Sequence, residues 1–160
     1  MIAVAKDLPP TIRAMTRGDI DAVSVIESQT YTYPWSMGIF RDCLMAGYTC
    51  LVLDLDDEVV GYAIMSVAAG EAHLLNICVT KWLAGQGIGK RLLQEMLHRA
   101  RAGNAERLFL EVRPSNESAL RLYNAMGFQA LGVRQRYYKA RDGNEDAVVL
   151  VHRFDNNRDS

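Results

Sequence analysis

The chain has 160 residues, with 18 Lys and Arg against 19 Asp and Glu, and carries a net charge of −1 at pH 7. This balance argues against a protein whose main task is to grip nucleic acid or an anionic membrane, because such proteins carry a large basic excess. The hydrophobic content of 49% is ample for a folded core and excludes a disordered chain. The apolar runs are too short to span a membrane, and the first residues lack the apolar core of a signal peptide. We therefore expect a cytoplasmic enzyme or binding domain.

No internal repeat, low-complexity stretch or linker divides the sequence, so we expect a single domain over residues 11–154, with flexible ends at 1–10 and 155–160. Strands are predicted at 11–15, within 48–67 on either side of an Asp56-Asp57 turn, and at 71–79, 107–113, 128–137 and 145–154. The last two strands flank a turn at Asp142-Gly143. Helices are predicted after a Thr16–Asp19 capping pattern, from Ser36 to Gly47, at 88–101, and at 115–126 with Ser115 as the cap. This order indicates an α+β or α/β sandwich around a central mixed sheet.

The cysteines and histidines give little sign of a metal or redox site. Cys43, Cys50 and Cys78 lie in apolar segments without a C-x-x-C motif. We interpret them as buried thiols in a reducing compartment, with a catalytic cysteine as the minor alternative. The three histidines lack the sequence spacing of metal ligands, so no metal is expected.

A glycine-rich loop, Gly85-Gln86-Gly87-Ile88-Gly89-Lys90, opens the most clearly predicted helix. Alternate glycines let the backbone curl, and a helix N-terminus attracts anions, so the loop is a candidate phosphate site. A dinucleotide fingerprint would need glycine at 90, and a nucleoside-triphosphate loop would need glycine at 84 and Ser or Thr at 91. The chain has Lys90, Ala84 and Arg91 instead. A plain glycine turn before a helix remains the alternative.

The span Ile77–Phe128 resembles the GNAT superfamily of acyl-CoA-dependent N-acetyltransferases. The superfamily's Q/R-x-x-G-x-G/A signature corresponds to Ala84–Gly89, with Ala84 in place of Gln or Arg, and its second signature corresponds to the Ser115–Phe128 segment. The resemblance implies acetyl-CoA as acetyl donor. It also implies a mostly antiparallel, twisted central sheet flanked by about four helices.

Further motifs resemble the RimI branch, over residues 11–151. They are Pro34-Trp35-Ser36, Asn76-Ile77-Cys78-Val79, Leu110-Glu111-Val112-Arg113, Arg136-Tyr137-Tyr138 and the Asp142–Ala147 segment. That branch acetylates the N-terminal alanine of the eighteenth small-subunit ribosomal protein. The resemblance therefore implies an Nα-acetyltransferase whose partner is a ribosomal-protein N-terminus, acting as a monomer or weak dimer without nucleic acid or membrane. Acetylation of a small amine, and a CoA-binding module without catalysis, are the alternatives.

Glu111 is the candidate proton acceptor. An α-amino group, with a pKa of about 7.7–8.0, must lose a proton to attack a thioester, so a base is needed. Glu111 lies within the apolar strand Leu108–Val112, where burial would raise its pKa toward that of a useful base. The alternative is that Glu111 only pairs with Arg113, its neighbour two residues on. The resemblance favours the catalytic role.

The last predicted helix carries the other candidate catalytic side chain. Asn116, Leu120 and Tyr123 lie on one stripe of that helix. Tyr123 is the expected proton donor to the CoA thiolate, with a plain core aromatic as the alternative. The resemblance implies that Asn116 binds the pantetheine arm.

By the same resemblance, the backbone of Ile77, Cys78 and Val79 pairs with pantetheine and residues 85–90 hold the pyrophosphate. A backbone N–H near Cys78 or Val79 is the candidate donor to the developing oxyanion.

Four aromatic residues are candidates for the walls of a substrate groove: Tyr33, Trp35, Tyr137 and Tyr138. Near Tyr137 and Tyr138 the chain also carries Arg134, Arg136, Lys139 and Arg141. Basic residues among aromatics favour RNA contact in other settings. Because the overall charge is near zero, we expect a solvated hairpin face here instead.

Overall fold

The computed structural model describes residues 9–140 and 143–155. Within these ranges the elements are β1 (Thr11–Ala14), α1 (Ile20–Thr30), α2 (Met37–Met45), β2 (Thr49–Leu55), β3 (Glu58–Ala68), β4 (Glu71–Val79), α3 (Ile88–Ala102), β5 (Arg107–Val112), α4 (Glu117–Ala125), β6 (Gln129–Ala140) and β7 (Gly143–Arg153). The predicted order of helices and strands is confirmed. The expected flexible ends at 1–10 and 155–160 and the Asp142 turn fall largely outside the described residues.

The strands follow the order β1-β2-β3-β4-β5-β7-β6 in one sheet. The pairs β1–β2, β2–β3, β5–β7 and β6–β7 are antiparallel, whereas β4 pairs with β5 in parallel, Glu71–His73 opposite Arg107–Phe109. The expected mixed, mostly antiparallel sheet with four helices is thus confirmed within the described residues. The chain divides into two compact units, called here the first unit (Met1–Ser66 with Asn76–Met96) and the second unit (Val67–Leu75 with Leu97–Ser160). A single domain over 11–154 stays a prediction.

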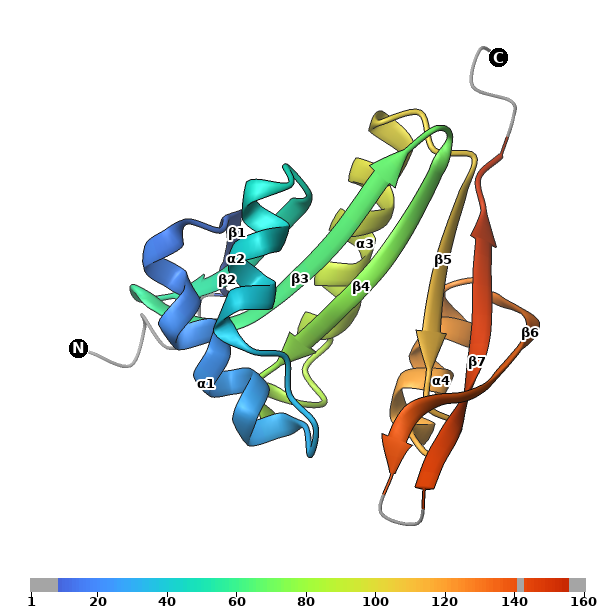
Figure 1. The fold of residues 1–160 in the computed structure, drawn as a ribbon. Coiled ribbons are helices and arrows are strands. Elements are labelled where there is room, and N and C mark those ends of the chain that lie inside the picture. The colour runs from blue at the N-terminus through green and yellow to red at the C-terminus, as the bar shows by residue number, and fades with distance from the viewer. Residues whose placement is uncertain (1–8, 141–142, 156–160) are drawn as a thin grey trace. The chain divides into compact units, whose positions relative to one another are not determined.

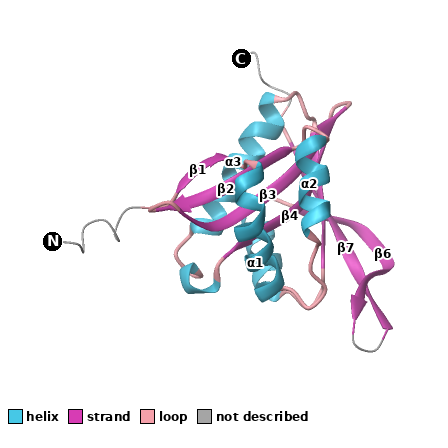
Figure 2. Ribbon diagram, turned by 60° about the vertical axis from the view of Figure 1, so that its left-hand side comes forward, coloured by secondary structure: helices cyan, strands magenta, loops and turns pink. Residues whose placement is uncertain are grey.

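In the first unit, helices cover both faces of the strands. Figures 1 and 2 show α1 and α2 on one face of β2 and β3, and the start of α3 on the other. Each helix buries an apolar stripe, as its sequence period predicts. The fully buried side chains include Val23, Phe40, Leu51, Leu53, Tyr62, Ile64, Leu92, Leu93 and Met96.

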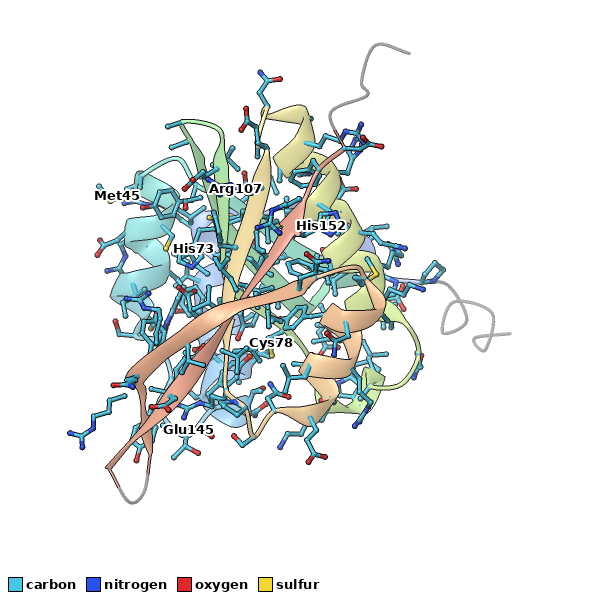
Figure 3. The ribbon with its side chains drawn as sticks, turned by 90° about the vertical axis from the view of Figure 1, so that its right-hand side faces the viewer. Met45, His73, Cys78, Arg107, Glu145 and His152 are labelled. Atoms are coloured by element: carbon cyan, nitrogen blue, oxygen red, sulfur yellow. The ribbon has the colours of Figure 1, made fainter. Side chains whose placement is uncertain are left out.

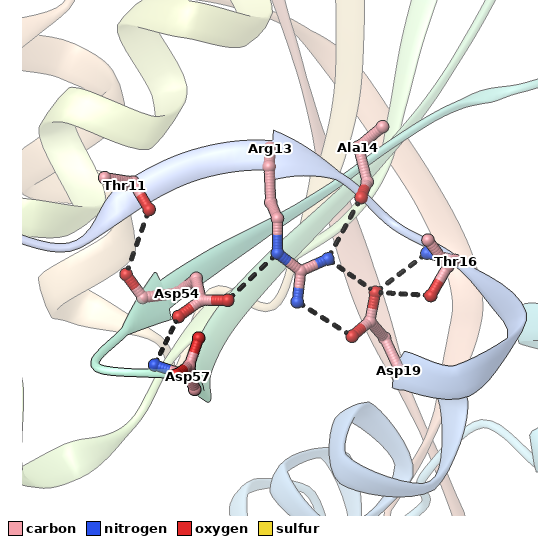
Figure 4. A network of polar contacts seen from close by, with 7 residues as sticks. All are labelled: Thr11, Arg13, Ala14, Thr16, Asp19, Asp54 and Asp57. Carbon is pink, nitrogen blue, oxygen red and sulfur yellow. Dashed lines mark hydrogen bonds and ion pairs between the residues drawn. The ribbon is translucent and has the colours of Figure 1, made fainter.

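One arginine fixes the start of α1. Arg13 on β1 donates from Nη1 and Nη2 to the two carboxylate oxygens of Asp19, at 2.8 and 2.9 Å, and from Nε to Asp54 at 2.9 Å (Figure 4). Asp19 also accepts from the backbone N–H of Thr16, which confirms the predicted capping pattern. The hydrogen bond from Arg13 lowers the pKa of Asp19 against the opposing effect of its burial. The direction in which α1 leaves β1 is therefore set by a charged, multiply bonded contact.

The second unit contains β5, β7 and β6 together with α4. Its buried apolar side chains include Leu108, Leu110, Val112, Tyr123, Phe128, Leu150 and Val151. Strands β6 and β7 form a long hairpin (Figure 2) whose register shifts between Arg134 and Tyr138. Arg136, inside that shift, has a φ of 54°. Such a bulge twists the strand and redirects the side chains that follow it.

The cap of α4 differs from the prediction. Asn116, and not Ser115, is the N-cap: its side-chain oxygen accepts from the backbone N–H of Ala119 at 3.2 Å. Ser115 instead donates its hydroxyl to Glu145 at 3.2 Å. The two residues are both good caps, so their sequence alone did not decide between them.

Candidate active site

The glycine loop of the first unit has the backbone that an anion cradle needs. Gly85 and Gly87 have φ values of +79° and +77°, a region that residues with a Cβ rarely adopt. A Cβ on either glycine would meet no atom within 4 Å, so the surface over the loop is open. The loop runs directly into α3, whose first N–H groups lack partners within the helix. These residues fit a phosphate group held by backbone amides.

The loop lies beside the end of β4. A Cβ built on Gly89 would lie 3.9 Å from Cγ2 of Val79. In the same strand, the carbonyl oxygen of Ile77 accepts from the Tyr31 hydroxyl at 3.3 Å. The first unit therefore brings the predicted pyrophosphate loop and the predicted pantetheine strand together.

The three cysteines are free and buried, as predicted. Burial raises the pKa of the Cys78 thiol, and it raises that of Cys50 to about 11. A thiol of raised pKa carries little thiolate at neutral pH, so the alternative of a catalytic cysteine loses its support.

In the second unit, the carboxylate of Glu111 on β5 contacts two basic side chains, His73 and Arg134. Its side chain is 9% exposed. Oε2 lies 2.5 Å from Nε2 of His73 on β4, which is labelled in Figure 3, and Oε1 accepts from Nη1 of Arg134 on β6 at 3.0 Å. An ionised carboxylate only accepts hydrogen bonds, so Nε2 of His73 carries the proton in this contact.

The expected rise in the pKa of Glu111 is wrong. Burial does raise the pKa, but the hydrogen bonds and charges of His73 and Arg134 outweigh it, and the net shift is downward. The alternative pairing with Arg113 is wrong as well. Arg113 donates to Glu145 at 3.1 Å and lies over the Tyr138 ring at 4.4 Å from its centre. Glu111 is thus an ionised carboxylate near neutral pH, with each oxygen in contact with a different donor.

Tyr123 lies on α4, as expected, and Asn116 is the N-cap that immediately precedes this helix. Tyr123 is 7% exposed and packs against Phe128, with ring centres 5.5 Å apart. Burial raises the pKa of its hydroxyl to about 12. The side-chain oxygen of Asn116 serves as the helix cap, which leaves its amide NH₂ as the group that can address a ligand.

The four candidate substrate aromatics fall into two pairs. In the first unit, Tyr33 is exposed and Trp35 is half-buried against Phe40, with ring centres 5.3 Å apart. In the second unit, Tyr137 lies within the register shift of β6 and Tyr138 is the first paired residue after it, and their ring centres lie 4.9 Å apart.

The tyrosine pair is tied to the Glu111 cluster. Arg134 stacks over the Tyr137 ring at 4.3 Å from its centre while it bonds Glu111. Arg134 is therefore engaged within the protein, which argues against its being part of an RNA-binding face. Arg141 lies outside the described residues.

The sequence does not identify the two side chains that bind Glu111, which are His73 and Arg134. His73 lies 38 residues before Glu111 and Arg134 lies 23 after it. No local motif marks either one. His73 reaches Glu111 because the parallel register of β4 and β5 sets it opposite Phe109. Arg134 reaches it from β6, so both contacts depend on how the strands pair in the sheet.

Three comparisons show which known proteins this chain resembles. The model of the acetyltransferase (GNAT) family matches residues 20–128. The [ribosomal protein bS18]-alanine N-acetyltransferase of Salmonella typhimurium is 34% identical over 141 residues, which are 88% of this chain and 95% of that protein. The crystal structure of the ribosomal-protein-S18-alanine N-acetyltransferase from Escherichia coli matches with a TM-score of 0.83 and 32% identity, over 89% of this chain and 92% of that one. Ard1 from Thermoplasma volcanium matches with a TM-score of 0.84 and 26% identity, over 91% and 98%.

Within the described residues, no helix has the length and apolar character required to cross a bilayer. No group of three or more potential metal-ligating side chains is found there either. The expected absence of a metal stays a prediction.

Proposed function

The chain belongs to the acetyltransferase (GNAT) family, and on that basis we propose that it transfers the acetyl group of acetyl-CoA to the N-terminal alanine of ribosomal protein bS18. The observation that carries the proposal is the extent of the match to enzymes named for that reaction. Relatives at 33–34% identity align over 88% of this chain and 95% of their own length. The expected cytoplasmic location follows from this substrate, and the expected state is a monomer or weak dimer.

The first unit supplies the groups for the acetyl donor. The amides of Gly85 to Lys90 would hold the pyrophosphate, and the backbone of Ile77 to Val79 would pair with the pantetheine arm. The positive φ values of Gly85 and Gly87 and the open space above them support this assignment. Ala84 contributes no polar side chain, so the backbone and the helix N-terminus carry phosphate recognition.

Glu111 is the proposed proton acceptor. At pH 7.5 roughly a third of an α-amine with a pKa of about 7.7–8.0 is already neutral, so attack does not require a strong base. The nitrogen becomes acidic once it bonds to the thioester carbonyl carbon, and even a carboxylate of lowered pKa then accepts its proton. The low pKa of Glu111 thus favours proton transfer after the N–C bond forms and before the C–S bond is fully broken.

Tyr123 is the proposed proton donor to the departing sulfur. Its pKa of about 12 keeps the hydroxyl protonated throughout the physiological range. An ordinary thiol has a pKa of about 8.5, so full transfer from such a phenol to a thiolate is uphill. We expect Tyr123 to stabilise the thiolate chiefly by donating a strong hydrogen bond as the C–S bond breaks.

Thiol release in the presence of acetyl-CoA tests the proposal. The substrates are a peptide beginning Ala-Arg, the same peptide with a blocked N-terminus, and spermidine. We expect release of free CoA with the first peptide only. Brisk release with spermidine and none with the peptide would instead support small-amine acetylation. Binding of CoA without turnover of any amine would support the non-catalytic module.

A further inference from the structure

Glu27 is a buried carboxylate that the proposed reaction does not use. It lies on α1, is 2% exposed, and accepts three hydrogen bonds in the first unit. Oε1 accepts from the Tyr62 hydroxyl at 2.6 Å and from Nδ2 of Asn76 at 2.8 Å, and Oε2 accepts from the backbone N–H of Trp35 at 2.9 Å. The three donors come from β3, from β4 and from the loop between α1 and α2.

These donors explain why the residue is a carboxylate. All three are neutral groups that donate, and a carboxylate is the acceptor-only side chain that offers two oxygens to them at once. Burial raises the pKa of the Tyr62 hydroxyl, which keeps its proton available for the bond. A glutamine would place an NH₂ group against at least one donor. Burying an anion with no cationic partner among these bonds is costly, so a role beyond packing is expected of it.

The contact with Trp35 fixes a loop that carries candidate substrate residues. Residues 31–36 connect α1 to α2 and contain Tyr33 and Trp35. The loop is held at its far end by the Glu27 bond to Trp35, and at its near end by the Tyr31 hydroxyl on the carbonyl of Ile77. The Trp35 ring rests on Phe40, which packs edge-on against Tyr62. The backbone and the ring of Trp35 are therefore held by one buried cluster, since Glu27 and Phe40 both contact Tyr62.

Asn76 links this arrangement to the strand assigned to the acetyl donor. It precedes Ile77 in β4, and its amide is bound to the same Glu27 oxygen as the Tyr62 hydroxyl. A single side chain therefore connects the loop that would meet the acceptor peptide with the strand that would meet pantetheine.

We propose that Glu27 is a positioning residue for the acceptor peptide: its carboxylate holds the backbone of Trp35, and so fixes the loop 31–36 in the conformation that receives the peptide N-terminus. The inference rests on the proposed function in its use of an acceptor peptide. The hydrogen bond from the Trp35 backbone N–H to Glu27, called the tether below, does not depend on that function and is measured separately.

Steady-state kinetics of Glu27→Gln test the role in substrate binding. The variant retains one oxygen for Tyr62 and Asn76 but leaves Trp35 without its acceptor. Loss of a buried hydrogen bond predicts a KM for the Ala-Arg peptide raised about tenfold, with the KM for acetyl-CoA changed less than about threefold. Glu27→Asp, which is still acceptor-only, should recover part of the peptide affinity. Equal changes in the two KM values, or no change in either, would overturn the proposal.

Tyr62→Phe is the matched control, because it removes one donor to Glu27 and leaves the Trp35 contact in place. We expect its peptide KM to rise less than that of Glu27→Gln. An equal or larger rise would show that general loosening of the buried cluster, and not the Trp35 bond, sets peptide affinity.

Two measurements read the tether without any activity. The chain has two tryptophans and seven tyrosines, so in a Trp82→Phe background Trp35 is the sole tryptophan, and excitation at the red edge of its absorption avoids the tyrosines. Glu27→Gln should then make Trp35 emission more susceptible to acrylamide quenching. In the wild type, the backbone amide of Trp35 should exchange hydrogen more slowly than that of Tyr33, an exposed residue of the same loop. This comparison does not depend on the folding of any variant. Unchanged quenching or rapid Trp35 exchange would refute the tether, whereas an inactive wild type with both signatures present would refute the proposed function alone.

Discussion

Replacing Glu111 by glutamine separates proton acceptance from structure. In the wild type, Oε1 bonds Arg134 at 3.0 Å and Oε2 contacts His73 at 2.5 Å. A glutamine oxygen can keep the Arg134 bond, and its NH₂ can donate to His73 once that ring carries its proton on Nδ1. The shape and both contacts therefore survive, and we expect a loss of stability of no more than about 1 kcal/mol.

The catalytic loss should be much larger. Removal of a general base typically lowers a rate by about 10²–10⁴-fold, which corresponds to about 3–5 kcal/mol of transition-state stabilisation. We expect this loss in kcat at saturating peptide and acetyl-CoA, with the KM values little changed, since the interaction is made as the proton moves. Thiol release measures the rate, and urea unfolding confirms that the variant is folded.

Glu145→Gln provides the matched control. Glu145 is a second carboxylate of the same unit, paired with Arg113 at 3.1 Å and 26% exposed. Its loss should leave kcat within about threefold of the wild type, because an ion pair of this exposure contributes little. A folded Glu111→Gln enzyme that also stays within threefold would refute the assignment of Glu111 as proton acceptor.

Three further predictions address the remaining groups. Tyr123→Phe should lower kcat by about 10²-fold or more but leave the shape of the pH–rate profile below pH 10 as in the wild type, because a hydroxyl with a pKa of about 12 does not titrate in that range; pH–rate profiles of both proteins check this. Gly87→Ala should raise the KM for acetyl-CoA about tenfold, since a Cβ at a φ of +77° costs about 1–2 kcal/mol, whereas Gly89→Ala, at a glycine without positive φ, should raise it less. The pKa of Asp19 is lowered by Arg13, so its ionised form adds stability above the unfolded-state pKa of about 3.9, and that stability is lost as pH falls below this value. Asp19→Asn should therefore destabilise the protein at pH 7 but much less at pH 3 in urea unfolding; an equal effect at the two pH values would contradict the argument.

Much of the fold was predictable because it follows from local chemistry. The turn at Asp56-Asp57, where both residues have positive φ, and the glycines at 85 and 87 are positions where few other residues fit. The apolar stripe of α3 and the alternation along the strands likewise predict which side chains are buried. The cap of α4 was misplaced by one residue, because Ser115 and Asn116 are equally good caps and the competing bond of Ser115 to Glu145 is a tertiary contact.

The site was predictable only in its components. The apolar residues around Glu111 predict its burial correctly, but the sign of its pKa shift depends on His73 and Arg134, which reach it from other strands. Arg134 comes from a strand that pairs with β7 and carries a bulge, and no short-range pattern encodes that. Glu27 was missed for the same reason, since its partners Tyr62 and Asn76 lie 35 and 49 residues away.

Mass spectrometry of ribosomal protein bS18, after incubation with the protein and acetyl-CoA, tests the proposed reaction on its full-length substrate, with the modified position located by fragmentation. We expect a single added acetyl group on the α-amine of the N-terminal alanine, and no addition with Glu111→Gln. An unmodified N-terminus, or acetyl groups found on lysine side chains instead, would contradict it.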